Sequence, residues 1–143
     1  MRKHIMAITY PPKIEPVMRG LCTMTTRPGW HREVGDEILI HTWDGKPYRS
    51  KWGNRIRWEI IGLMNIKINA EGIDLYSDFI EPTDNHNDNL WIEESYRWEQ
   101  LDSIARMEFI EPPTGLAFRD VLKSMYGELK GQKMQIISGM VIE

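Results

Sequence analysis

A chain of 143 residues, of which 41% are hydrophobic and 27% charged, is long enough for one hydrophobic core and has the composition of a folded protein. The net charge of −3 excludes a protein that binds nucleic acid through bulk positive charge. No apolar run reaches the roughly 18 residues of a membrane span, and the N-terminal apolar stretch is too short for a secretion signal. A lone cysteine cannot form an internal disulfide. We therefore expect a cytoplasmic protein with no membrane partner.

The first half of the chain is dominated by short runs in which apolar and polar residues alternate, the pattern of half-buried strands. Prolines at the start and Gly20 at the end predict one short helix, and Gly62 predicts a bend in the longest strand. We expect strands over Ile5–Tyr10, Cys22–Arg27, Glu37–Trp43 and Arg55–Lys67, and a helix over Pro12–Arg19.

The second half begins with polar, acidic residues and ends with a capped helix and a strand. Asp74–Asn89 has the composition of a loop, and the apolar spacing over Leu90–Met107 predicts a helix. Thr114 can cap a further helix that Gly127 ends, and Met134–Ile142 reads as the last strand. Strands with about three helices between them predict an α+β fold, a closed or partly open β-barrel with helices packed at its ends.

A short polar motif lies in the second predicted strand. Alternation sends Thr25 and Arg27 to one face and Cys22 and Thr26 to the other. Hydroxyl and guanidinium groups on one face can bind a phosphate, a carbonyl or a base edge. The competing interpretation is a threonine favoured by strand propensity, an arginine at a strand end and a small buried cysteine.

The segment from Gly20 to Arg27, with the Gly35–Asp36 turn after it, resembles the signature of the ASCH family, part of the PUA-like superfamily of small β-barrels associated with RNA. The family motif is G-x-K-x-x-T-x-R before a G-D turn. Gly20, Thr25 and Arg27 stand in register with it, whereas Cys22 stands where the family has lysine. The order of the predicted elements is similar over most of the chain.

The resemblance implies a single PUA-like domain over residues 1–143, a β-barrel with about three helices around it. Residues 68–98 are then an acidic polar insertion without a counterpart in a minimal member. The family commonly carries an acid at a helix end, and Glu108 matches it.

Some members that resemble this chain are acetylcytidine amidohydrolases, which implies catalytic roles for Thr25 as nucleophile and Glu108 as acid and base. A threonine hydroxyl needs a neighbouring base or cation to attack an amide. Cys22 cannot supply that cation, so catalysis needs a cation from elsewhere in the fold, for which Arg19 and Lys13 of the preceding helix are candidates. Whether the chain is an enzyme therefore stays open.

Basic and aromatic residues alternate after Trp43, and no acid lies between Lys46 and Arg57. In sites for single-stranded nucleic acid, bases stack on aromatic rings while Lys and Arg neutralise phosphates. The competing interpretation is an ordinary solvated face. We expect the ligand-binding residues to be Lys46, Tyr48, Arg49, Lys51, Trp52 and Arg55, together with Arg27 and Cys22 of the strand motif, with Trp30 as a further stacking candidate.

Neither a metal nor a cofactor is expected, because the Asp84–Asn89 segment lacks the glycine and closing glutamate of a calcium loop and the four histidines lack zinc spacing. The leading hypothesis is an ASCH-type module that binds single-stranded RNA or a nucleotide-like molecule in a polar, basic cleft beside the barrel. One alternative is a hydrolase in that cleft, either an amidohydrolase for acylated nucleosides or a ribonuclease. Another is a regulatory domain that binds a small ligand or a protein partner.

Overall fold

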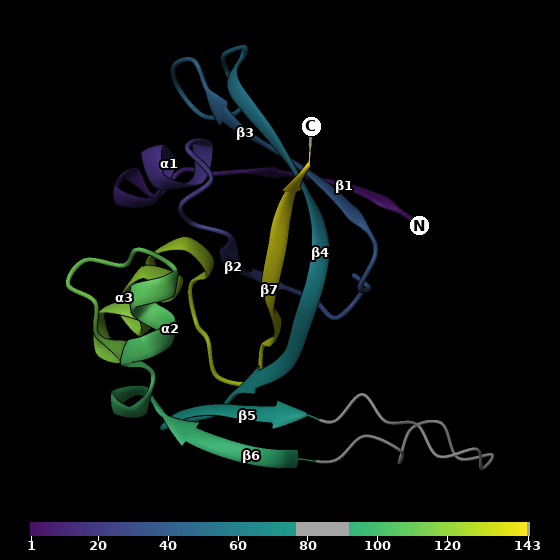
Figure 1. Cartoon of the computed structure of the whole chain (residues 1–143). Helices are drawn as coiled ribbons and strands as arrows, with labels where there is room; N and C mark the ends of the chain where they lie inside the picture. The colour runs from purple at the N-terminus through teal and green to yellow at the C-terminus, as the bar shows by residue number, and fades with distance from the viewer. Residues whose placement is uncertain (77–91, 143) are drawn as a thin grey trace.

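Strand β4 (Trp52–Ile68) organises the sheet, as Figure 1 shows. The structure is a computed structural model that describes residues 1–76 and 92–142. The first half of β4 pairs antiparallel with β3 (Glu37–Trp43), and its last residues pair with β5 (Gly72–Tyr76). Its other edge pairs with β7 (Lys133–Ile142), so β4 connects both halves of the molecule.

Five strands, in the order β1–β3–β4–β7–β2, form a curled strip that makes half of a barrel. β1 (Lys3–Ala7) runs parallel to β3, and β2 (Met24–Pro28) runs antiparallel to β7. β5 and β6 (Ile92–Arg97) form an antiparallel pair that extends the sheet from the end of β4. A side chain links the two edge strands of the strip, because Nη2 of Arg27 donates to the carbonyl of Ala7 at 2.8 Å.

A bulge in β4 changes the buried face along the strand. The register with β7 shifts between Ile60 and Gly62. Before the shift, Trp58 and Ile60 are fully buried in one hydrophobic cluster; after it, Ile66 is fully buried in another. Gly139, the partner of Ile60 on β7, leaves the room that the Trp58 indole needs, since a Cβ there would lie 2.5 Å from the ring.

Two hydrophobic cores result, with helix α1 (Pro11–Met18) beside the upper half of the sheet in Figure 1 and α2 (Asp102–Met107) and α3 (Gly115–Tyr126) beside its lower half. The barrel core lies under α1 and contains Met6, Ile8, Val17, Cys22, Ile38, Ile40, Trp58, Ile60 and Ile137. The helix core lies under α2, α3 and a 3-10 turn, η2 (Trp98–Gln100). It contains Ile66, Ile68, Ile73, Trp98, Leu101, Ala105, Ile110, Phe118, Leu122, Leu129, Met134 and Ile136.

The expected α+β class, with a curled, barrel-like sheet and helices packed on it, is confirmed. The strands and the helix predicted before residue 68 are present with their ends shifted by a few residues, and the predicted bend is the bulge. The last helix begins as expected, because Oγ1 of Thr114 accepts from the N–H of Ala117 at 3.2 Å. It ends at Gly127, whose φ of 76° lies in the positive range that glycine adopts more readily than other residues.

The helix predicted over Leu90–Met107 is wrong in its first part, since Ile92–Arg97 is strand β6 and α2 begins only at Asp102. Pairing with β5 overrides the local helical spacing, an effect that a single-segment pattern does not contain. The predicted Asp74–Asn89 loop is also wrong at its start, where β5 runs to Tyr76; its remainder lies outside the described residues.

Candidate functional site

Glu108 is the centre of a buried polar cluster in which three elements meet. It lies at the C-terminal end of α2 and is 3% exposed. Nζ of Lys13, from α1, donates to Oε1 of Glu108 at 2.8 Å, and the hydroxyl of Thr26, from β2, donates to Oε2 at 2.5 Å. We call Lys13, Thr26 and Glu108 the buried triad. The ion pair is almost completely removed from solvent, and one cation and one hydroxyl compensate the charge of the carboxylate.

The backbone after Glu108 explains how its side chain reaches the barrel. Phe109 adopts φ 58°, the left-handed region that bulky residues rarely occupy. The N–H of Ile110 then bonds to the carbonyl of Ala105 at 2.9 Å, which reverses the chain directly after the helix. This strained turn holds Glu108 against β2, and such strain is concentrated at functional sites.

Thr25 and Arg27 lie beside the buried triad and line the same small cavity as Lys13, Thr26 and Glu108. Nε of Arg27 donates to the hydroxyl of Thr25 at 3.2 Å. The cavity measures about 20 Å³, room for about one water molecule. Thr25, Arg27 and Glu108 therefore share one pocket, but the hydroxyl that bonds to Glu108 is that of Thr26.

Sequence reasoning missed Thr26 because it assumed that only one face of β2 meets polar groups. Thr25 and Thr26 are each 3% exposed, so both faces of the strand are covered. The position of Lys13 is indicated by the sequence, because the apolar Val17 follows it by four residues and so lies on the same face of the helix. In the structure both side chains are buried.

Cys22 lies in the barrel core with no exposed area, on the apolar side that alternation predicted. Its Sγ is 3.5 Å from the carbonyl oxygens of Met24 and Met107. Burial raises the pKa of the thiol above its ordinary value. Cys22 is not among the residues that line the cavity of the buried triad.

A basic-aromatic surface lies in the β3–β4 connection and at the start of strand β4. We define it by the residues Lys46, Tyr48, Arg49, Lys51, Trp52 and Arg55. The four basic side chains are exposed. Trp52 stacks on the buried His41, with ring centroids 4.0 Å apart and planes 14° apart, and the Arg55 guanidinium lies 5.0 Å from the Trp52 centroid. Tyr48 is 84% exposed and adopts φ 65°, and the centroid of its ring lies 5.2 Å from that of Trp43.

An open cavity of about 420 Å³ adjoins this surface. Its walls are mainly aromatic or basic and include His41, Trp43, Tyr48, Trp52, Arg27 and Arg32. Arg27 lines both this cavity and that of the buried triad, so it lies between the two candidate regions.

Asp36, the acid of the Gly-Asp turn, is buried and has a structural role. It accepts from the N–H of Arg2 and of Glu33 at 3.0 Å each, and its other close partner is Nε2 of His4 at 2.9 Å. Although burial raises the pKa of Asp36, these hydrogen bonds outweigh burial and hold the pKa well below its usual range. Asp36 thus fastens the β2–β3 loop to the N-terminal strand.

No protein-family model, curated protein or solved structure matches this chain. Within residues 1–76 and 92–142, no cluster of three or more His, Cys, Asp or Glu could hold a metal ion; the Asp84–Asn89 segment lies outside that range. No helix of the described part is long and apolar enough to cross a membrane. The geometry of the two candidate regions therefore carries the functional argument.

Proposed function

We propose that this chain is a PUA-like domain of ASCH type that binds single-stranded RNA or a nucleotide through the basic-aromatic surface. The supporting features are the order of strands and helices around a half-barrel, the buried acid of the Gly-Asp turn, and a helix-end glutamate that reaches β2. These are the positions at which the sequence resembles the family.

The observation that carries the proposal is the conformation of Tyr48. A tyrosine that is 84% exposed gains nothing from core packing, and a φ of 65° costs conformational energy for a residue with a side chain. Backbone strain of this kind persists where the surroundings impose it, often at ligand clamps. The ring offers a free face on which a base can stack, whereas His41 already covers one face of Trp52.

The charge around Tyr48 suits a phosphate chain. Lys46, Arg49, Lys51 and Arg55 are exposed, and none of them takes part in an ion pair within the described part of the chain. Unpaired cations that surround an exposed ring are the arrangement that binds single strands through stacking and counterion release.

The test is fluorescence anisotropy with a labelled single-stranded RNA at several salt concentrations. Lys51→Glu/Arg55→Glu should weaken binding and reduce the slope of log K against log salt by about 1.4, because each phosphate contact contributes about 0.7. Tyr48→Ala should weaken binding roughly 5- to 150-fold with little change of slope, because stacking is not ionic.

Lys130→Glu is the matched control, since Lys130 is exposed in the α3–β7 connection and does not line the cavity beside Tyr48. Equal affinity of the wild type and the Lys51→Glu/Arg55→Glu variant at low salt would contradict the proposal. A loss of affinity in Lys130→Glu as large as in that variant would show only general charge attraction.

A second candidate function, an amidohydrolase acting on acylated nucleosides, is favoured by the position of Lys13. Lys13 supplies the buried cation that Cys22 cannot, next to a hydroxyl already bonded to a carboxylate. In such a site the hydroxyl of Thr26 attacks the amide carbon, its proton passes to Glu108, and the amine leaves with that proton. A water molecule, deprotonated by Glu108, then cleaves the acyl ester on Thr26, which releases the carboxylic acid and restores the hydroxyl. The nucleoside would occupy the wider depression of about 500 Å³ that shares Thr9 and Tyr10 with the triad's cavity.

This second candidate is tested by assaying acetylcytidine hydrolysis with a matched pair of variants. Thr26→Val should abolish turnover while Thr25→Val retains it, because only Thr26 bonds to Glu108. Both replacements keep the side-chain shape, and thermal melting checks that both variants fold. Absence of turnover by the wild type, or equal loss in both variants, would contradict a role of the buried triad in catalysis.

A further inference from the structure

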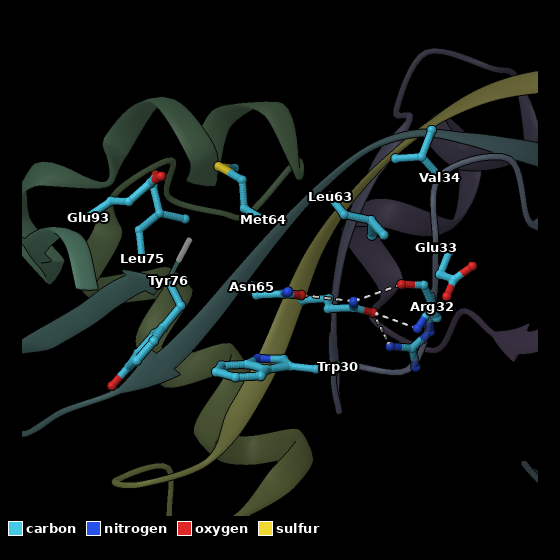
Figure 2. Close-up of a pocket in the computed structure, with 11 residues that line it drawn as sticks. Trp30, Arg32, Glu33, Val34, Leu63, Met64, Asn65, Leu75, Tyr76 and Glu93 are labelled. Atoms are coloured by element: carbon cyan, nitrogen blue, oxygen red, sulfur yellow. Dashed lines mark hydrogen bonds between the residues drawn. The ribbon is translucent and has the colours of Figure 1, made fainter. Parts of the chain in front are cut away.

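A further cavity, of about 430 Å³, lies on the face of β4 and β7 that continues from the barrel core beyond the bulge. On this face Leu63 and Ile137 are still apolar partners, but the next pair across the two strands is Asn65 and Gln135. The loop between β2 and β3 and the strand β5 form the sides of the cavity. We call it the Trp30 pocket; Figure 2 shows its side chains.

The floor of the Trp30 pocket is a fixed amide. Gln135 is 1% exposed, and its Nε2 donates to the carbonyl of Arg32 at 3.0 Å and to Oδ1 of Asn65 at 2.9 Å. Its Oε1 lies 3.2 Å from Nη1 of Arg32, which donates to it. Because both ends of its amide are already hydrogen-bonded, Gln135 orients Arg32 and Asn65 and has no group left to bind a ligand.

Arg32 and Asn65 line the cavity, and both side chains carry N–H donors. Nε of Arg32 is buried and has no partner among the described residues, and a buried N–H without an acceptor is costly. Burial and the nearby charge of Arg27 lower the pKa of Arg32, so an acceptor from a ligand would relieve an unfavourable site. Oδ1 of Asn65 is used by Gln135, so the group that Asn65 can offer is its Nδ2 donor.

The wall of the pocket is an aromatic ring held in place. Nε1 of Trp30 donates to the carbonyls of Ile66 and Met134, at 3.0 and 2.9 Å, across the β4–β7 pair. Figure 2 shows the indole beneath Asn65, with Tyr76 at its side; the ring centroids of Trp30 and Tyr76 are 5.3 Å apart. A ring whose orientation is fixed before binding loses little freedom when a planar ligand stacks on it.

The carboxylates in the lining decide the charge of the ligand. Glu33 and Glu93 line the pocket with Arg32, and Nζ of Lys133 lies 4.8 Å from the centroid of the Trp30 ring, so the charges nearly balance and a neutral ligand is favoured over a phosphate. The same carboxylates can accept from N–H groups of a neutral heterocycle. A volume of about 430 Å³ falls in the range of small-molecule sites.

We propose that the Trp30 pocket binds a nucleobase that carries a ring carbonyl beside a ring N–H, as guanine and uracil do, stacked on Trp30 with its carbonyl on the donors of Arg32 and Asn65. Adenine should bind more weakly, because each of its ring nitrogens has one lone pair and cannot accept from both donors, as a carbonyl oxygen with two lone pairs can. The inference rests on the proposed function and names the base that an RNA would place here, while the phosphates remain on the basic-aromatic surface. Arg32 lines both cavities and connects the two regions.

The first experiment titrates guanosine, uridine and adenosine into the protein and follows the indole N–H resonance of Trp30 by NMR. Guanosine and uridine should shift it, and adenosine should bind about tenfold more weakly or not at all. Asn65→Asp retains the acceptor for Gln135 but replaces the Nδ2 donor by an acceptor, so it should weaken guanosine binding by about tenfold or more. If Asn65→Asp does not fold, Arg32→Lys removes the Nε donor and should have the same effect.

Lys130→Ala is the matched control, because Lys130 is exposed, lines neither the Trp30 pocket nor the cavity beside Tyr48, and should leave nucleoside binding unchanged. RNA binding that persists while the wild type binds neither guanosine nor uridine would overturn the pocket's role and leave the proposed function standing. Guanosine binding that depends on Asn65, without any RNA binding, would retain the pocket as a site for free nucleosides and overturn the proposed function. Equal binding of all three nucleosides would refute the proposal that the donors of Arg32 and Asn65 select the base.

Discussion

The buried triad makes a quantitative prediction, because its two charges are almost completely removed from solvent. Lys13 is 5% and Glu108 is 3% exposed, and they are joined at 2.8 Å. Lys13→Met removes the cation and leaves the carboxylate with the hydroxyl of Thr26 as its remaining side-chain partner. The expected loss is about 3–5 kcal/mol, the cost of leaving one buried charge unpaired. For a domain of this size, that loss lowers the melting temperature by roughly 10–15 °C.

The double variant Lys13→Met/Glu108→Leu separates the ion pair from simple packing. Replacing both charges by apolar groups removes the unpaired charge, so the double variant should be more stable than Lys13→Met alone. Urea unfolding of the wild type, both single variants and the double variant gives the coupling free energy. Lys130→Met, at an exposed site, is the control and should change stability by less than about 0.5 kcal/mol. Losses below about 1 kcal/mol in the single variants, or strictly additive losses, would refute this account.

Three further predictions concern the turn acid, the cysteine and one glycine. Because the folded-state pKa of Asp36 is depressed, its stabilisation is present above the unfolded pKa of about 3.9 and is lost as the pH falls below it; Asp36→Asn should cost about 1–3 kcal/mol at neutral pH and flatten the acid limb of a pH–stability curve. Cys22 should react with a thiol reagent only as fast as the protein unfolds, and Cys22→Lys should prevent stable folding, whereas rapid labelling of the native protein would contradict full burial. Gly139→Ala should destabilise by about 1–3 kcal/mol in urea unfolding, since its Cβ would lie 2.5 Å from the Trp58 ring; an unchanged midpoint would mean that the indole has room to move.

Local sequence patterns correctly predicted the elements that bury the same face along their whole length or begin and end at clear cap residues. The alternation in Glu37–Trp43 and the cap and stop residues around α3 are such cases, since each depends on neighbours in the chain. β6 was missed because its residues are mostly exposed, and what makes it a strand is its pairing with β5. Whether a segment of this kind is helix or strand is decided by a partner distant in sequence.

The candidate site was predicted in part for the same reason. The motif residues Thr25 and Arg27 and the helix-end Glu108 could be found by their order in the chain, and they line one cavity. That Thr26 bonds to Glu108 depends on how α2 docks against β2 across 82 residues of sequence, which no local spacing contains. Of the residues in the Trp30 pocket, the sequence indicated only Trp30. The others could not be predicted, because the bulge of β4 decides which face of the strand carries Asn65.

The sharing of β4 and β7 between the two cores has a consequence for unfolding. β4 contributes Trp58 and Ile60 to the barrel core and Ile66 to the helix core, and β7 divides its residues in the same way, with Ile137 in one and Ile136 in the other. Neither core can open without exposing apolar side chains of a strand that the other core needs. The described part of the chain should therefore lose its structure in one cooperative transition, with α1 and α3 melting together although they belong to different cores.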